Sequence, residues 1–516
     1  LLSQTDVLAL TGMGGIGKTQ LALAYAQQYQ DKYPAVLWVN ADTQDDLIIS
    51  FSALAKTLQL PERNAQDQNK IVAAVQRWLQ RNQNWLLILD NADDLPIIRP
   101  YLPKPGQGRV LITTRESKTG ELARPIPVTK LDNEQAALFL LYRAGIIAPD
   151  TSLQEAPELE RTAAKTLAYE LDGLPLALDQ AGAFMEEKDE TPEKYLQLYQ
   201  QEGQKLRGKR GEYTADHRSV SVTFSLAFEK VAAANPAGAD LLRLCAMLHP
   251  EEIPQELLTE GAELLGDTLK TALANPMGLV NTRTEVCRYS LLSYDRSNKT
   301  LSLHRVVQQV IRDMMTDDEQ RLWAERAIRV LNTTFPAPEY KTWDICERLL
   351  NHARIGTKHI EHWHFELEEA SNLLSRLSIY LWQHTLYEEA EPLLQYALEI
   401  LEQVLGSEHP NVAESLNDLA IIYSEQGRYD EAEPLYQRSL TIREKVLGNE
   451  HPDVARSLNG LGAVYTIQGR YDEAEPMFQR ALTIREKTPD SERPFLLPIS
   501  IDNLAELYRH QDRYDE

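Results

Sequence analysis

The chain has 516 residues, a length that suggests about three or four domains. Its net charge is −24, from 77 acidic and 53 basic residues, which argues against non-specific binding to nucleic acid or to an anionic membrane, since both need a positive field. No apolar run approaches the ~18 residues that span a bilayer. The three cysteines form no close pair and no metal-ligand spacing, which favours a reducing, cytoplasmic location.

The N-terminal region, residues 1–130, alternates apolar strands with helices. The strands are continuous apolar runs rather than alternating ones, a pattern typical of a parallel sheet with helices on both faces. We therefore expect an α/β domain. The predicted strands are 7–11, 35–39, 85–90 and 109–114, and the predicted helices are 20–26, 45–58 and 68–81.

A complete phosphate-binding loop lies between the first strand and its helix. Residues 12–19 read GMGGIGKT and fit G-x-x-x-x-G-K-[ST] without substitution. Such a loop aims backbone N–H groups at phosphates, so we expect ATP or ADP with Mg²⁺. Lys18 would reach the β- and γ-phosphates, and the Thr19 hydroxyl would ligate the metal. The nucleotide-binding residues expected here are Gly12, Gly14, Gly15, Ile16, Gly17, Lys18, Thr19 and Gln20.

Polar residues end two later strands of the expected sheet. Asp90 follows four apolar residues and is expected to hold Mg²⁺, directly or through water. Arg115 ends the next strand, at the edge where ligands bind open α/β sheets. An arginine there can contact a γ-phosphate; an ordinary surface arginine is an equally good interpretation.

The middle of the chain reads as helices followed by a hairpin. Helices are predicted at 133–144 and at 159–185, the second with a break at Gly173-Leu174-Pro175. Farther on, residues 289–294 and 299–303 flank a turn-forming segment, and a helix is predicted at 306–315. Helices, a hairpin and a helix suit a winged-helix module.

The C-terminal part repeats itself. The motif Y-[DE]-E-A-E-P ends at Pro392, Pro434 and Pro476, each 42 residues after the last, and a fourth copy begins at Arg513. Fixed periods of this size indicate stacked helical units with a surface for a protein or peptide ligand. Because the chain starts at Leu1 without methionine and ends inside a repeat, we expect it to be a piece of a longer protein.

These motifs occur in an order that resembles a known family. The phosphate loop, LLILD at 86–90, ITTR at 112–115, GLPLAL at 173–178 and Leu303-His304 are similar to the NB-ARC (AP-ATPase) class of STAND NTPases. The repeats resemble tetratricopeptide repeats of the kinesin-light-chain type. The resemblance implies a multidomain chain with an α/β P-loop NTPase domain at 1–130, a helical domain at 131–212, a winged-helix domain at 213–325, a helical linker at 326–375 and an all-α tetratricopeptide solenoid at 376–516.

The resemblance also implies roles for residues that would otherwise be read as structural. Pro175 would pack on the adenine, Arg115 would sense the γ-phosphate, and His304 would contact the β-phosphate of ADP. Asn417 and Asn459 hold matching positions in successive repeats and would clamp a peptide backbone. Packing between helices is an equally good interpretation of these two asparagines.

Three features depart from the family's pattern. Asn91 stands where a second acidic residue usually follows Asp90, and because an amide is a poor base we expect slow ATP hydrolysis, unless Asp93 or Asp94 substitutes. Arg305 replaces the aspartate of the Met-His-Asp motif. A Gly-Arg-Glu segment that normally precedes the first strand is absent. The expected catalytic set is Lys18, Asp90, Asn91 and Arg115, and the expected metal ligands are Thr19 and Asp90.

The function implied by the resemblance is an ATP/ADP signalling switch. ADP would hold the nucleotide domain closed, and a ligand on the repeats would permit exchange for ATP. The open form would assemble as a homo-oligomer and activate an effector outside the chain, in defence, cell death or regulation. The alternatives are a transcription regulator using the winged-helix module, a motor-type AAA+ ATPase, and a scaffold stabilised by unhydrolysed nucleotide. Acidic charge counts against DNA binding, and Asn91 counts against a motor.

Overall fold

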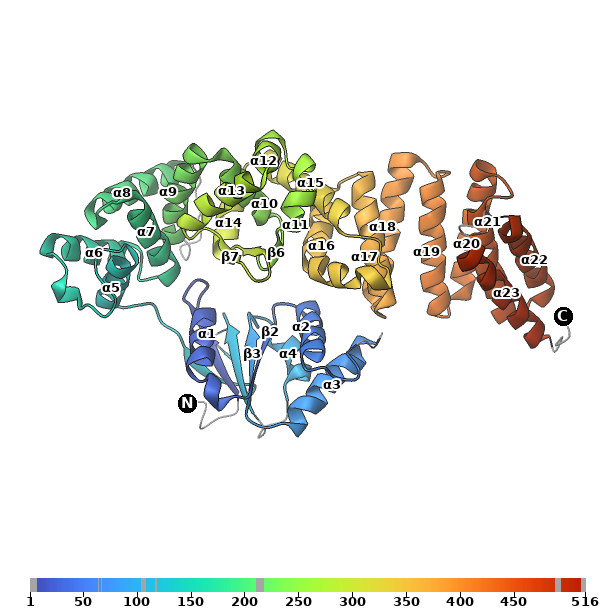
Figure 1. Cartoon of the computed structure of the whole chain (residues 1–516), viewed down its shortest axis with the longest axis horizontal. Coiled ribbons are helices and arrows are strands. Elements are labelled where there is room, and N and C mark those ends of the chain that lie inside the picture. The colour runs from blue at the N-terminus through green and yellow to red at the C-terminus, as the bar shows by residue number, and fades with distance from the viewer. Residues whose placement is uncertain are drawn as a thin grey trace. The chain divides into compact units, whose positions relative to one another are not determined.

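The structure, a computed structural model, describes residues 7–63, 65, 67–103, 108–116, 118–209, 218–487 and 493–511. The chain divides into two units, Leu1–Val330 and Leu331–Glu516 (Figure 1). Within the described residues, no helix combines the length and apolar character needed to cross a membrane. The expected boundary at 212 and the fourth repeat copy at 513–516 lie outside the described residues.

The first unit begins with a five-stranded sheet in which all the pairings are parallel. The strand order is β2-β3-β4-β1-β5, which confirms the predicted parallel α/β domain. The register sets Asn40 beside Asp90 and Thr11 beside Thr114, so the polar strand ends share one edge. The strands are β1 (Val7–Thr11), β2 (Ala35–Asn40), β3 (Trp85–Asp90), β4 (Arg109–Thr114) and β5 (Arg124–Pro127).

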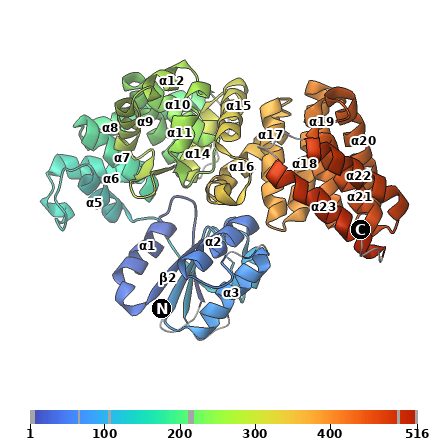
Figure 2. The same cartoon turned by 45° about the vertical axis from the view of Figure 1, so that its right-hand side comes forward.

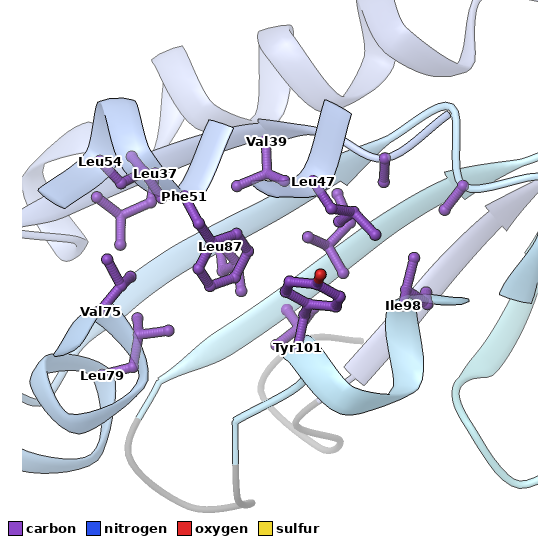
Figure 3. Packing of buried hydrophobic residues seen from close by; sticks show 14 of the residues in the cluster. Leu37, Val39, Leu47, Phe51, Leu54, Val75, Leu79, Leu87, Ile98 and Tyr101 are labelled. Carbon is purple, nitrogen blue, oxygen red and sulfur yellow. The ribbon is translucent and has the colours of Figure 1, made fainter. Parts of the chain in front are cut away.

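Helices cover both faces of this sheet (Figure 2). Side chains of β3 alternate between two apolar clusters: Leu87 packs in a cluster with α2 and α3, whereas Ile88 packs in another with α1. In the first cluster Phe51 and Tyr101 lie with ring centroids 5.2 Å apart (Figure 3). Burial on both faces explains why the strand is a continuous apolar run. The helices are α1 (Lys18–Gln28), α2 (Gln44–Thr57), α3 (Gln68–Arg81) and the short α4 (Leu95–Ile98).

The next region is helical, and the predicted break at Gly173 separates two helices. Gly173 has φ +61°, in the left-handed region, and a Cβ there would lie 2.3 Å from the Leu131 carbonyl oxygen. Pro175 occupies the first helical position, where its missing N–H costs nothing. The helices are α5 (Asn133–Arg143), α6 (Glu158–Glu170), α7 (Pro175–Lys188) and α8 (Pro192–Lys209).

The unit continues with helices and a small antiparallel sheet of order β6-β8-β7. The predicted hairpin is present, but its first strand is shorter than expected. Helix α13 extends to Arg288, and Tyr289, which is fully buried, is the C-cap of that helix. The third strand, β6, was not predicted. The elements are α9 (Arg218–Ala234), α10 (Pro236–Ala246), β6 (Ile253–Pro254), α11 (Glu256–Glu260), α12 (Asp267–Leu273), α13 (Pro276–Arg288), β7 (Ser293–Asp295), β8 (Thr300–Ser302) and α14 (Arg305–Met314).

The second unit is built from helix pairs, as the 42-residue period predicts. Helices α17 and α18, α19 and α20, and α21 and α22 pack as pairs, and small residues of these helices, Ala420, Ala432 and Ala474, are fully buried. Helix α17 begins at Glu368, so the first pair starts inside the segment expected to be a linker. The helices are α15 (Asp317–Thr334), which joins the units in sequence, then α16 (Trp343–Trp363), α17 (Glu368–Gln383), α18 (Tyr387–Leu405), α19 (Pro410–Glu425), α20 (Tyr429–Leu447), α21 (Pro452–Ile467), α22 (Tyr471–Lys487) and α23 (Arg493–His510).

Candidate nucleotide site

The glycine loop between β1 and α1 has the backbone that an anion site needs. Gly15 and Gly17 adopt φ +76° and +92°, conformations that favour glycine. Gly17 is the N-cap of α1 and contributes no side-chain cap, and no acidic residue lies in the first turn. The first N–H groups of a helix have no intrahelical partner. They can therefore bind phosphate, aided by the helix dipole.

Lys18 lies across this loop. Its ammonium donates hydrogen bonds to the carbonyl oxygens of Gly12 and Met13, at 2.6 and 2.9 Å. Burial lowers the pKa of Lys18, Asp93 and Asp90 oppose that shift, and Arg115 adds to it. The predicted lysine is thus half-buried beside charges from the ends of β3 and β4.

The other loop residues fall into two groups. Ile16 is buried, at 4% exposure, and acts in packing, whereas Gln20 is exposed at the start of α1. Gly12 and Gly14 are half-buried in the loop itself. The glycines and Gln20 are therefore accessible to a ligand, and the buried Ile16 side chain anchors the loop to the domain.

Asp90 and Thr19 meet at the end of β3. The Thr19 hydroxyl donates to Asp90 Oδ1 at 3.0 Å, and the Thr113 hydroxyl donates to the same oxygen. Burial raises the pKa of Asp90, and the hydrogen bonds from Thr113 and Thr19 oppose that shift. A hydroxyl beside a carboxylate fits Mg²⁺, which usually takes one or two protein oxygens and completes its shell with water and phosphate oxygens. Thr113 was not predicted, because a threonine at the end of an apolar strand carries no distinct signal.

Arg115 forms an ion pair with Asp93. Its backbone N and its Nε donate to the two carboxylate oxygens of Asp93, at 2.6 and 2.5 Å. The arginine side chain is 63% exposed, so the pair contributes little to stability. Asp93, one candidate for the missing second acid, is thus held by Arg115 at the strand ends.

The first turn of α7 contacts the phosphate loop directly. The Leu176 backbone N donates to the Gly15 carbonyl oxygen at 3.3 Å, and a Cβ on Gly15 would lie 3.3 Å from Leu176 Cβ. Pro175 precedes Leu176 and is half-buried. The fold therefore brings Pro175 next to the loop, although more than 150 residues separate them.

A second distant part of the chain meets the strand ends through two polar residues, Glu251 and Arg305. Arg305 Nη1 lies 2.6 Å from Asp42 Oδ1, just after β2. Glu251 accepts a hydrogen bond from Asn91 Nδ2 at 3.2 Å, and Arg305 Nη2 lies 3.7 Å from the same glutamate oxygen. We call Asp42, Asn91, Glu251 and Arg305 the polar clasp. Sequence reasoning missed Glu251 and Asp42, because neither lies in a motif.

Charge explains why the polar clasp holds together. Burial raises the pKa of Glu251, and the charges of Arg305 and His249 oppose that shift. For Arg305, burial lowers the pKa, but Asp42 and Glu251 outweigh it, so the net direction is upward. The guanidinium thus stays charged between two carboxyl groups.

His304 immediately precedes the polar-clasp arginine. Its Nδ1 accepts a hydrogen bond from the Val306 backbone N at 3.2 Å, which makes it the N-cap of α14. Its side chain is exposed. The structure therefore places His304 next to a residue that contacts the nucleotide domain, and its contact with a β-phosphate stays a prediction.

Comparison with known proteins agrees with this geometry. Residues 1–143 match the NB-ARC domain family, and residues 369–445 and 422–487 match the tetratricopeptide repeat. The chain carries an NB-ARC domain followed by tetratricopeptide repeats. Residues 227–320 match a domain of unknown function, DUF7779, which includes Glu251 and Arg305 of the polar clasp.

Relatives share much of the chain at low identity. A nucleotide-binding leucine-rich repeat (NLR)-like protein of Hyaloscypha variabilis is 28% identical over 444 residues, covering 80% of this chain and 43% of that protein. Disease resistance RPP13-like protein 4 of Arabidopsis thaliana is 23% identical over 279 residues, covering 50% of this chain and 30% of that one. The chain thus spans less than half the length of these curated relatives. A putative kinesin light chain with TPR-like repeats from Podosopora anserina is 24% identical, covering 34% of this chain and 87% of that one, with a TM-score of 0.28.

In the tetratricopeptide repeats, the two asparagines predicted to clamp a peptide are buried. Asn417 is 1% exposed and Asn459 is 7% exposed. Asn459 Nδ2 donates to the Ser500 hydroxyl of α23 at 2.9 Å, which favours packing between helices for this residue. His409 and His451, each followed by a proline, are the N-caps of α19 and α21, which is a structural role.

Proposed function

We propose that this chain is the nucleotide switch and the sensor of a STAND-type signalling NTPase. One observation carries the proposal: residues far away in the sequence converge on the phosphate loop and the adjoining strand ends. They are Leu176 in the first turn of α7, and Glu251 and Arg305 of the polar clasp. A nucleotide in such a site contacts parts that can separate, so its identity can control whether they stay together. The NLR-like and disease-resistance relatives support a signalling role.

The residues fit a nucleotide with Mg²⁺, and each has a task. The loop N–H groups and Lys18 hold the phosphates, Thr19 and Asp90 hold the metal, and Pro175 and His304 contact the adenine and the β-phosphate. Bound Mg²⁺ neutralises phosphate charge during hydrolysis. Because Asn91 is a poor base, ATP hydrolysis is slow, which suits a switch better than a motor.

The switch works by opening and closing. ADP favours the closed form, in which the polar clasp is made; a protein or peptide ligand on the repeats loosens it and permits exchange for ATP. The open form assembles as a homo-oligomer and activates an effector in defence, cell death or regulation. Shifting a population from 1:99 to 99:1 needs about 5.5 kcal/mol of differential binding, an amount that several charged contacts and a repeat surface can supply together.

The Arg305→Ala variant tests this closure. It removes the 2.6 Å contact to Asp42, and partly buried ion pairs of this kind contribute roughly 1 kcal/mol. We expect release of a fluorescent ADP analogue, followed by stopped flow, to become about fivefold faster. The matched control is Arg296→Ala, at an exposed turn of the same region, which should release ADP as the wild type does. Equal release from all three proteins would exclude the polar clasp as part of the switch.

A further inference from the structure

Two positions that depart from the NB-ARC pattern meet at one carboxylate. Asn91 replaces the usual second acid, and Arg305 replaces the aspartate of the Met-His-Asp motif. Glu251 Oε1 accepts from Asn91 Nδ2 at 3.2 Å and lies 3.7 Å from Arg305 Nη2. Its other oxygen lies 3.5 Å from Asn40 Nδ2, at the end of β2. Glu251 thus joins the ends of β2 and β3 to the start of α14.

The contact with Glu251 fixes which way the Asn91 amide is turned. An ionised carboxylate only accepts hydrogen bonds, so the amide nitrogen must face Glu251 and the oxygen must face elsewhere. The Asn91 backbone is fixed as well, since its N–H donates to the Thr113 hydroxyl at 2.9 Å, and that hydroxyl donates to Asp90. Asn91 Oδ1 accepts no hydrogen bond from the described residues. A fixed acceptor therefore sits one residue after the metal-binding aspartate.

We propose that Glu251 is a positioning residue for ATP hydrolysis, which holds the Asn91 amide so that Oδ1 orients the attacking water. The proposal rests on the nucleotide switch proposed above and adds a consequence to it. Because Glu251 lies 160 residues after Asn91, outside the NB-ARC sheet, the amide is oriented only while the polar clasp is closed. Hydrolysis then belongs to the closed form, and the open form retains ATP.

The hydrolysis step does not require Asn91 to accept a proton. The water oxygen forms a bond to the γ-phosphorus, and the bond to the bridging oxygen breaks with its electrons remaining on ADP. Both protons of the water leave with the phosphate product, one on the attacking oxygen and one transferred to another oxygen of the γ-phosphate. An amide that orients water without taking its proton is the role that a glutamine plays in some GTPases.

Steady-state kinetics on the Glu251→Ala variant provide the first test. We expect kcat to fall about tenfold while the KM for ATP stays within about twofold of the wild type. Glu251→Gln keeps an oxygen that can accept a hydrogen bond from Asn91 Nδ2, so this variant should retain most of the activity. If Glu251 were itself the general base, Glu251→Gln would lose the activity instead. Glu260→Ala, which removes an exposed carboxylate from α11, is the matched control and should be unchanged.

A double-variant comparison separates positioning from a merely structural role. Since Glu251 acts through Asn91, Asn91→Ala alone should lower kcat by a similar factor, and adding Glu251→Ala should lower it no further. Asn91→Ala also tests the contact from its other side should Glu251→Ala not fold. Independent multiplication of the two effects, or an unchanged kcat in Glu251→Ala, would overturn the proposal.

A second readout needs no nucleotide. Hydrogen–deuterium exchange in a peptide covering 86–95 should become faster in Glu251→Ala but not in Glu260→Ala, because the end of β3 loses its anchor. Equal exchange in both variants would overturn the proposal. If the wild type binds no Mg-ATP, the proposed switch itself fails; if it binds ATP without hydrolysing it, the switch stands and the role of Glu251 fails.

Discussion

Replacing Lys18 with alanine should lower the affinity for both ATP and ADP by at least about a hundredfold. The ammonium is half-buried and bonded within 3 Å to two loop carbonyls, in a position where a phosphate would be the stronger acceptor. Charge-assisted contacts to phosphate are among the strongest polar interactions in proteins, and partial burial keeps solvent from screening this one. Titration of a fluorescent nucleotide measures the loss directly.

The matched control for Lys18 is Lys70→Ala. Lys70 lies on α3 of the same domain and is 72% exposed, and its ammonium lies 3.9 Å from Asp67 Oδ2. It should bind nucleotide as the wild type does. Circular dichroism should show both variants folded, because Lys18 belongs to neither apolar cluster of the sheet. Wild-type affinity in Lys18→Ala would refute the assignment of the phosphate loop.

The Gly173→Ala variant should lower the free energy of unfolding by roughly 3 kcal/mol. A Cβ there would lie 2.3 Å from the Leu131 carbonyl oxygen, and the residue has φ +61°. Left-handed backbone strain alone costs about 1 kcal/mol or more, and a clash with backbone adds to it because backbone cannot rotate away. Relief of the clash would also displace the first turn of α7, so we expect both the nucleotide affinity and the stability of Gly173→Ala to fall.

The Gly145→Ala variant separates the cost of left-handed backbone strain from the cost of the clash. Gly145 follows α5 and has φ +70°, but nothing lies within 4 Å of the added Cβ. The free energy of unfolding of Gly145→Ala should fall by about 1 kcal/mol, as measured by denaturant unfolding of both variants. Its nucleotide affinity should stay as in the wild type. Equal losses at the two glycines would show that the chain between α6 and α7 yields to the clash, and would remove the argument that it fixes Pro175.

The sequence predicted the elements that depend on local chemistry. The glycine loop, the apolar strand ending at Asp90 and the break at Gly173 each follow from residues close together in the chain. The contact of Thr19 with Asp90 was also predictable. Thr19 lies just after the loop that follows β1, Asp90 ends β3, and parallel strands place their carboxyl ends at one edge of the sheet. The repeat period likewise predicted the helix pairs of the second unit.

Other features depend on contacts that no local pattern carries. Strand β5 contains two prolines, which lack an N–H and so read as a loop, yet it lies at the edge of the sheet where only one side pairs. Strand β6 has only two residues. Glu251 and Asp42 became site residues only when the fold set them against Asn91 and Arg305. The substitutions at 91 and 305 were visible in the sequence, but their meeting at Glu251 was not.

The most direct test of the switch is the nucleotide that the purified protein carries, in the longest form of the polypeptide that includes this chain. Denaturation releases the nucleotide, and chromatography identifies and quantifies it. The account predicts about one ADP per chain, held by the closed polar clasp and slow to exchange. An empty site, or ATP in place of ADP, would contradict it.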